Sequence, residues 1–249
     1  MMRAKSEANS FWSMDLGIHW LMAVVGGFLG SFAATGYGNF ASAETGNILS
    51  MAKDINAGDW LRVLIRVLAF VIFAAGIAAG YQEGKRNTVR RSFLSIIVDA
   101  AALLLVTVLP DTVPSLVRVY PLFFASACQW MAFPGAAGFS CSPIFITNNF
   151  KQTVLGLLTY RDTREQHSLE QAILYGGTVL SFLGGAVIGA FAVLALGRLS
   201  TLPGIGLLVA AAVLVRIRSV WEKAKVTGKE KEELPEEFPV DTEQDTAID

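Results

Sequence analysis

The chain has 249 residues, of which 53% are apolar and only 16% are charged, with a mean hydropathy of +0.49 and a net charge of −1. A typical soluble domain is about 25% charged, and its surface must be polar enough to keep it dispersed. The composition therefore excludes an ordinary soluble enzyme and a disordered chain, and it predicts an all-α polytopic membrane protein.

Six segments are apolar and long enough to cross a bilayer as helices, which takes about 20 residues each. They are residues 16–36, 63–81, 93–109, 119–138, 169–196 and 199–215. The fourth is interrupted by Pro121, Gln129 and Pro134, although prolines are tolerated where neighbouring helices satisfy the freed carbonyls. An alternative for the first segment is a cleaved signal peptide, since Ala41-Ser42-Ala43 resembles a peptidase site.

The charges divide the chain into a cytoplasmic N-terminus (1–15), a six-helix membrane domain (16–218) and a C-terminal tail (219–249). Residues 222–249 carry four basic and ten acidic side chains, a net charge of −6, and they predict a disordered acidic tail. Most Lys and Arg residues of the membrane domain fall on the side of both termini. The positive-inside rule therefore predicts a plasma (cell inner) membrane protein with both termini in the cytoplasm.

An internal similarity relates the two halves of the membrane domain, about 16–109 and 119–215. A shift of 102 positions places residues 37–52 over 139–154, and Thr45-Gly46-Asn47 falls on Thr147-Asn148-Asn149. Three spans per half predict a 3+3 inverted repeat, a plan common among transporters. Short irregular polar segments, 40–49 and 144–154, follow helices 1 and 4. They are predicted either to dip toward a midplane site or to form interfacial loops.

The runs VVGGFLG, FASAETGN and ITNNFKQT resemble the YoaK-like family of small six-span bacterial membrane proteins. The resemblance covers residues 16–218 and is most specific over 40–47. It departs from the family at Gln129-Trp130, where Gln-Asn is usual, and at Thr147-Asn148, where Thr-Gly is usual. Because the function of that family is unknown, the resemblance implies a fold and a membrane location but no substrate.

Asp99 lies roughly 9 Å inside the third span, where an ionised carboxylate costs at least about 2.5 kcal/mol. It is predicted to couple proton or cation movement, the alternative being a structural partner of another side chain. Glu44 and Arg66 are a candidate outer gate, unless Arg66 extends to the interface. The candidate transport-path or ligand-binding residues are Glu44, Thr45, Asn47, Asp99, Gln129, Thr147, Asn148 and Asn149, with Arg66 as the gate partner.

These observations predict a small-solute or ion transporter or channel with a midplane site between inverted repeats, and not an enzyme. The alternatives are a non-transporting membrane scaffold and an intramembrane enzyme that uses Glu44 and Asp99 as paired carboxylates. The expected partners are the lipid bilayer and an unknown small solute or ion, with a homodimer left open. No motif for a nucleotide, a metal or nucleic acid is present, so no cofactor is expected.

Overall fold

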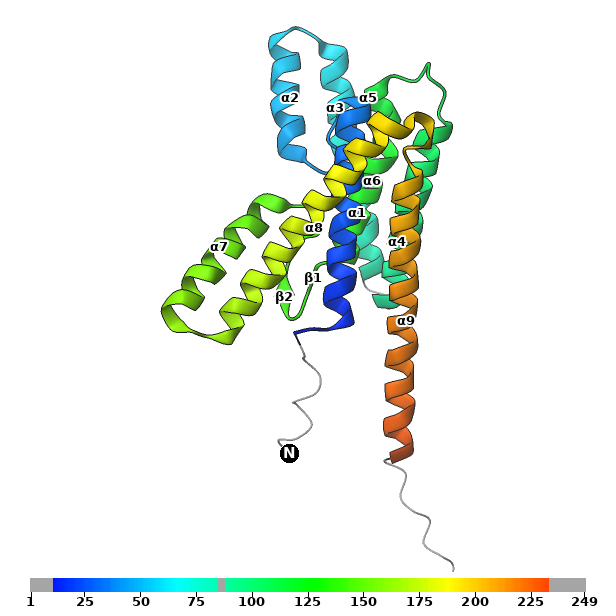
Figure 1. Cartoon of the computed structure of the whole chain (residues 1–249). Helices are drawn as coiled ribbons and strands as arrows, with labels where there is room; N and C mark the ends of the chain where they lie inside the picture. The colour runs from blue at the N-terminus through cyan, green and yellow to red at the C-terminus, as the bar shows by residue number, and fades with distance from the viewer. Residues whose placement is uncertain (1–10, 85–87, 233–249) are drawn as a thin grey trace, which may run out of the picture.

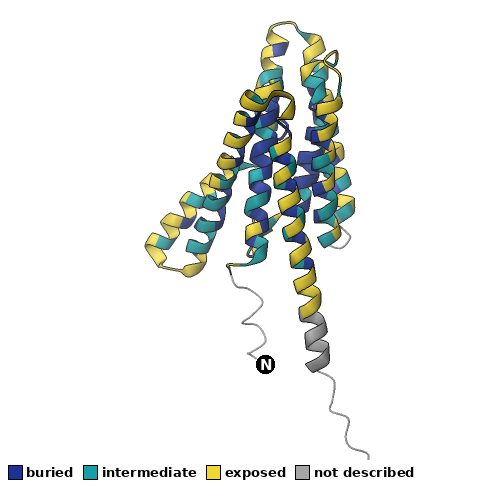
Figure 2. Cartoon of the chain, turned by 45° about the vertical axis from the view of Figure 1, so that its right-hand side comes forward, coloured by how far each residue is buried: buried dark blue, intermediate teal, exposed yellow. Residues whose placement is uncertain are grey.

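The computed structural model describes residues 11–84 and 88–232, and five of its helices are long and apolar enough to cross a membrane. They are α1 (Met14–Tyr37), α3 (Trp60–Gly84), α4 (Thr88–Val108), α8 (Gln166–Leu196) and α9 (Leu202–Glu232). Their outer faces carry exposed apolar side chains, such as Leu64 at 64% and Leu194 at 79% exposure, while polar Asp99 and Gln129 are buried inside (Figure 2). This apolar exterior is typical of lipid contact, and the chain is an integral membrane protein.

The fourth predicted span, residues 119–138, contains a shorter helix, α6 (Tyr120–Ala132), followed by a hairpin of β1 (Gly135–Ala136) and β2 (Phe139–Ser140). The helix ends at this point because Pro134 disfavours the helical conformation of Phe133, which has φ −122° and ψ 70°. At 1.5 Å per residue α6 is roughly 20 Å long, against about 30 Å of hydrocarbon. It is buried against α3 and α4, so protein rather than lipid surrounds most of it.

Two amphipathic helices, α2 (Glu44–Asn56) and α7 (Ile146–Thr163), occur where short irregular polar segments are predicted. Only the few residues that precede each helix are irregular. Packing of α2 against α3 and of α7 against α8 supplies the tertiary contacts that stabilise helices with this content of Ser, Thr and Asn. In Figure 1 both helices lie on the left of the bundle, α2 beside its upper part and α7 beside its lower part.

The N-terminal end of α1 and the C-terminal end of α9 lie at the same end of the molecule, which is the lower end in Figure 1. α9 continues to Glu232, beyond the predicted end of the last span, because its Lys- and Glu-rich extension favours helix. Two short elements, α5 (Ser115–Arg118) and η1 (Gly197–Leu199), connect the long helices at the other end. The predicted N-terminal segment before Phe11 and the tail after Glu232 lie outside the described residues.

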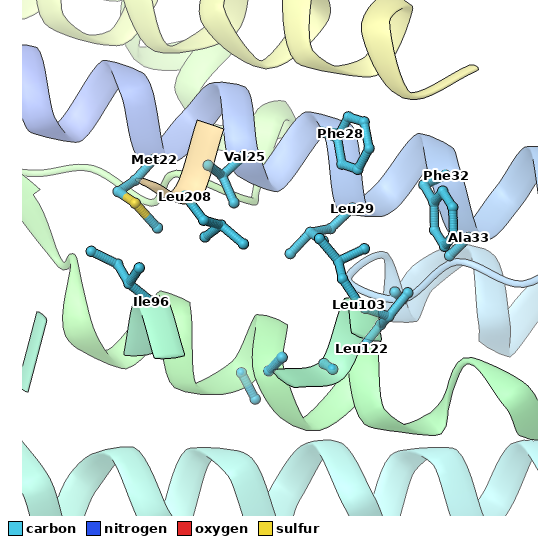
Figure 3. Close-up of a cluster of buried hydrophobic side chains, with 14 of the residues drawn as sticks. Met22, Val25, Phe28, Leu29, Phe32, Ala33, Ile96, Leu103, Leu122 and Leu208 are labelled. Carbon is cyan, nitrogen blue, oxygen red and sulfur yellow. The ribbon is translucent and has the colours of Figure 1, made fainter. Parts of the chain in front are cut away.

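The core lies between α1, α4, α6 and α9. Figure 3 shows Phe28 and Leu29 of α1 above Leu103 of α4 and Leu122 of α6, with Leu208 of α9 alongside. All five side chains are at most 2% exposed. This apolar layer separates the two ends of the bundle.

Glycines bring helices from the two halves into backbone contact. A Cβ atom added at Gly185 of α8 would overlap the carbonyl oxygen of Val24 in α1, and one at Gly27 of α1 would overlap that of Phe182 in α8. α3 approaches α6 in the same way, since a Cβ at Gly76 would lie 2.6 Å from the Phe124 carbonyl oxygen. Small residues at such positions allow helix backbones to approach closely, and these three glycines act as packing residues.

The α1–α8 contact predicts that Gly185→Leu destabilises the protein by about 1–3 kcal/mol or more, since overpacking a close contact forces backbone shifts. Gly184 is the matched control, because nothing lies within 4 Å of a Cβ atom added there. Thermal unfolding in detergent measures both variants. Equal midpoints for Gly185→Leu and Gly184→Leu would contradict the contact.

Candidate functional site

A cavity of about 1000 Å³ lies between the first turns of α2 and α7 and is bounded by α1 and α8. Its walls therefore come from both polar segments that the sequence analysis singles out. Its polar lining includes Ser42, Glu44, Thr45, Thr147, Asn148 and Lys151. Four predicted site residues, Glu44, Thr45, Thr147 and Asn148, are thus brought together at one place.

Asn47 and Asn149 make the same hydrogen bond in the two halves. Asn47 Nδ2 donates to the carbonyl oxygen of Phe40 at 2.8 Å, and Asn149 Nδ2 donates to that of Ser142 at 2.7 Å. In each case the acceptor lies seven residues earlier, and both asparagines are at most 1% exposed. Each bond ties the irregular segment to the first turn of the helix that follows. These two predicted site residues shape the cavity walls and do not line the cavity.

The first turns of α2 and α7 line the cavity, and neither helix start has a side-chain cap. The residues that precede the two helices, Ala43 and Phe145, supply no side-chain hydrogen bond to the first turn. A helix start in this state carries partial positive charge and favours negatively charged or polar acceptor groups. Two such helix starts line the same cavity, so the partial positive charge of both acts on whatever occupies it.

Opposite charges line the same cavity without pairing. Glu44 Oε2 accepts a hydrogen bond from Asn47 Nδ2 at 3.3 Å, while Glu44 Oε1 is buried and has no partner. Lys151 also lines the cavity, and no ion pair joins it to Glu44. From sequence alone Lys151 is a candidate for anion binding or for lining a vestibule, but it is not among the predicted site residues, because a lysine near the end of a span usually reports topology.

Asp99 and Gln129 lie apart from this cavity, on α4 and α6 in the interior of the bundle. Asp99 is fully buried, and neither of its carboxyl oxygens has a hydrogen-bond partner. Gln129 Nε2 donates to the carbonyl oxygen of Met22 in α1 at 2.6 Å. The predicted site residues therefore divide into a cavity group and a bundle-interior group.

Arg66 pairs with Asp54 instead of its predicted partner Glu44. Arg66 Nε lies 2.6 Å from Asp54 Oδ2, and Arg66 Nη1 donates to Asn39 Oδ1 at 3.4 Å. Arg66 and Asp54 are 7% and 8% exposed, so the pair is buried between α2 and α3. The partner was missed because no sequence rule links a residue near the end of one helix to one in the next.

The comparisons with known proteins identify a family. The family described as "Protein of unknown function (DUF1275)" matches residues 18–214, which run from the first turns of α1 into the first half of α9. No curated protein and no solved structure matches the chain.

The buried Arg66–Asp54 pair predicts that Arg66→Ala lowers the free energy of unfolding by about 3–5 kcal/mol, because an uncompensated carboxylate stays buried. Arg62 is the matched control: it lies one turn earlier in α3 and pairs with Asp59 at an exposed position. Arg62→Ala is expected to cost about 1 kcal/mol or less. Chemical unfolding in detergent measures both, and similar losses would contradict the structural role of the pair.

Proposed function

We propose that this chain, which belongs to the DUF1275 family, is a membrane transporter or channel for a small solute, with its binding site in the cavity between α2 and α7. The observation that carries the proposal is the origin of the cavity walls. Thr45 and Thr147 both line it, and they are related by the same offset of 102 residues that relates Asn47 to Asn149. A site built from corresponding parts of two halves is the plan of inverted-repeat transporters.

The helix pairing supports the inverted repeat. α1, the first helix of one half, packs along α8 of the other half, and α6, the first helix of the second half, packs along α3. α4 packs on α6 as α9 packs on α1, and α4 and α9 contact each other. Exchanging the halves therefore reproduces the same set of contacts. The matched Asn47 and Asn149 hydrogen bonds extend this correspondence to single atoms.

The lining of the cavity supports an organic solute with an apolar body and a polar or charged end. Phe40, Ile144 and Phe182 form much of the wall, while Glu44 and Lys151 supply one charge of each sign. Apolar walls with a few placed polar groups are typical of small-molecule sites. A bare inorganic ion would make no favourable contact with these apolar side chains.

In this proposal the chain passes the membrane six times, with α6 as a shorter fourth crossing that is shielded from lipid. Both termini face the cytoplasm of a plasma (cell inner) membrane. The shared end of α1 and α9 in Figure 1 and the concentration of Lys and Arg toward that side support this orientation.

The cavity site predicts that reconstituted protein speeds the uptake of at least one small solute. Proteoliposomes are challenged with urea, glycerol, alanine or sodium acetate, and light scattering follows the recovery of vesicle volume. Thr45→Trp and Thr147→Trp each place an indole in the cavity and are expected to reduce the protein-dependent rate at least about tenfold. That factor corresponds to about 1.4 kcal/mol.

Phe150→Trp is the control for these variants, since Phe150 is 62% exposed and does not line the cavity. It is expected to retain the wild-type rate. Protein-dependent rates that are zero for all four solutes, or that are unchanged in both cavity variants, would overturn the proposal.

The proposed orientation predicts which sites react with a membrane-impermeant thiol reagent. After Cys128 and Cys141 are replaced, a cysteine at Lys53 or Asp111 is expected to be labelled from outside intact cells. One at Arg161 is expected to react only after the cells are opened. External labelling at Arg161 would contradict the six-pass arrangement.

A further inference from the structure

Five buried side-chain oxygen atoms on α4 and α6 have no hydrogen-bond partner. They are both carboxyl oxygens of Asp99, the hydroxyls of Ser95 and Ser126, and the amide oxygen of Gln129. These four side chains are between 0% and 3% exposed. Buried polar groups are nearly always bonded, and each group left without a partner costs about 1–3 kcal/mol. These five are among eleven such side-chain nitrogen and oxygen atoms in the described residues, and all five lie on this one pair of packed helices.

The helix register predicts that these side chains lie on facing turns of α4 and α6. α4 and α6 pack against each other in opposite directions. At one end Ser92 and Ala132 line a common cavity, and at the other Leu105 and Tyr120 do. Counting inward from both ends sets Ser95 opposite Gln129, and Asp99 opposite Ser126. Ser95 and Asp99 are four residues apart, so they share one face of α4.

The contacts of neighbouring side chains are consistent with this placement. The amide of Gln129 is fixed by its Nε2 hydrogen bond to the Met22 carbonyl oxygen, which leaves Oε1 for a different partner. Leu208 and Ala211 of α9 and Phe73 of α3 are buried apolar residues of the same core cluster as Ile96 and Leu103, which flank Asp99 along α4.

We propose that Ser95, Asp99, Ser126 and Gln129 bind a dehydrated sodium ion. Carboxylate, hydroxyl and amide oxygens are the ligands that hard cations take, and none of the four side chains is a soft sulfur or nitrogen donor. One carboxylate neutralises one positive charge. A divalent ion would leave an uncompensated charge in the apolar interior, which disfavours calcium and magnesium.

This inference deepens the proposed function by naming the coupling ion, but binding can be measured without transport. Purified full-length protein in detergent is unfolded by heat in sodium, potassium or choline chloride at equal ionic strength. A ligand that binds only the folded state raises the midpoint as its concentration rises. We expect a saturable increase in sodium chloride and none in choline chloride.

Asp99→Asn is expected to abolish the sodium response, and Ser126→Ala to raise the half-saturating sodium concentration about tenfold. Ser92→Ala is the matched control, because Ser92 is 3% exposed, lies on α4 one turn before Ser95, and is outside the proposed ligand set. It is expected to keep the wild-type response. If Asp99→Asn does not fold, Ser126→Ala carries the test.

Equal midpoints in all three salts would overturn the sodium site, as would a sodium response that Asp99→Asn or Ser126→Ala leaves unchanged. A midpoint that depends on pH but not on sodium would instead assign Asp99 to proton binding and would also overturn it. None of these outcomes affects the uptake test of the α2–α7 cavity. A failed cavity test with an intact sodium response would in turn leave this site standing.

Discussion

In a bilayer, water is absent from the hydrocarbon core, so every backbone polar group there must find its partner inside the protein. This constraint governs the two irregular segments that enter the cavity. The Phe40 and Ser142 carbonyls lie outside regular helix, and each is satisfied by one buried asparagine amide. The bonds permit non-helical backbone beside α1 and α8, and this backbone creates the space between α2 and α7. The cavity thus depends on two hydrogen bonds with the same geometry.

The same constraint gives the unpartnered oxygens around Asp99 their significance. Other buried side chains have at least one partner and leave a single atom without one. His19 Nε2 lies 3.2 Å from the Thr178 hydroxyl while its Nδ1 has no partner, and Asn149 Nδ2 bonds to Ser142 while its Oδ1 has none. Both carboxyl oxygens of Asp99 lack a partner, and the hydroxyls of Ser95 and Ser126 also lack one. The cavity and the α4–α6 seam lie on different helix pairs, so solute and ion would occupy separate sites.

Much of the fold can be predicted from the sequence, because long apolar runs leave few alternatives to a spanning helix. The third span, predicted over 93–109, is found as α4 from Thr88 to Val108. The length of α6 was overestimated because hydropathy does not register the effect of Pro134 on the preceding residue. Helix in α2 and α7 was underestimated because it depends on packing against α3 and α8. Local propensity contains no information on that packing.

The candidate site was predictable in part for a related reason. The 102-residue offset identifies Thr45 and Thr147 as corresponding positions, and the structure brings both to one cavity. The offset does not distinguish these threonines from Asn47 and Asn149, whose side chains bind backbone carbonyls instead of lining the cavity. The partner of Arg66 depends on how α2 folds against α3, so the choice of Asp54 over Glu44 needed three-dimensional information.

The glycine contacts have a mechanical consequence. Where the backbones of α1 and α8 touch through Gly27 and Gly185, neither helix can slide or rotate past the other without driving Cβ atoms into main-chain atoms. α3 and α6 are joined in the same way through Gly76. Sliding or rotation within each pair is therefore costly, whereas helices whose backbones do not touch, such as α4 and α9, meet less resistance. We expect a change of conformation to move one pair against the other, with little change inside either pair.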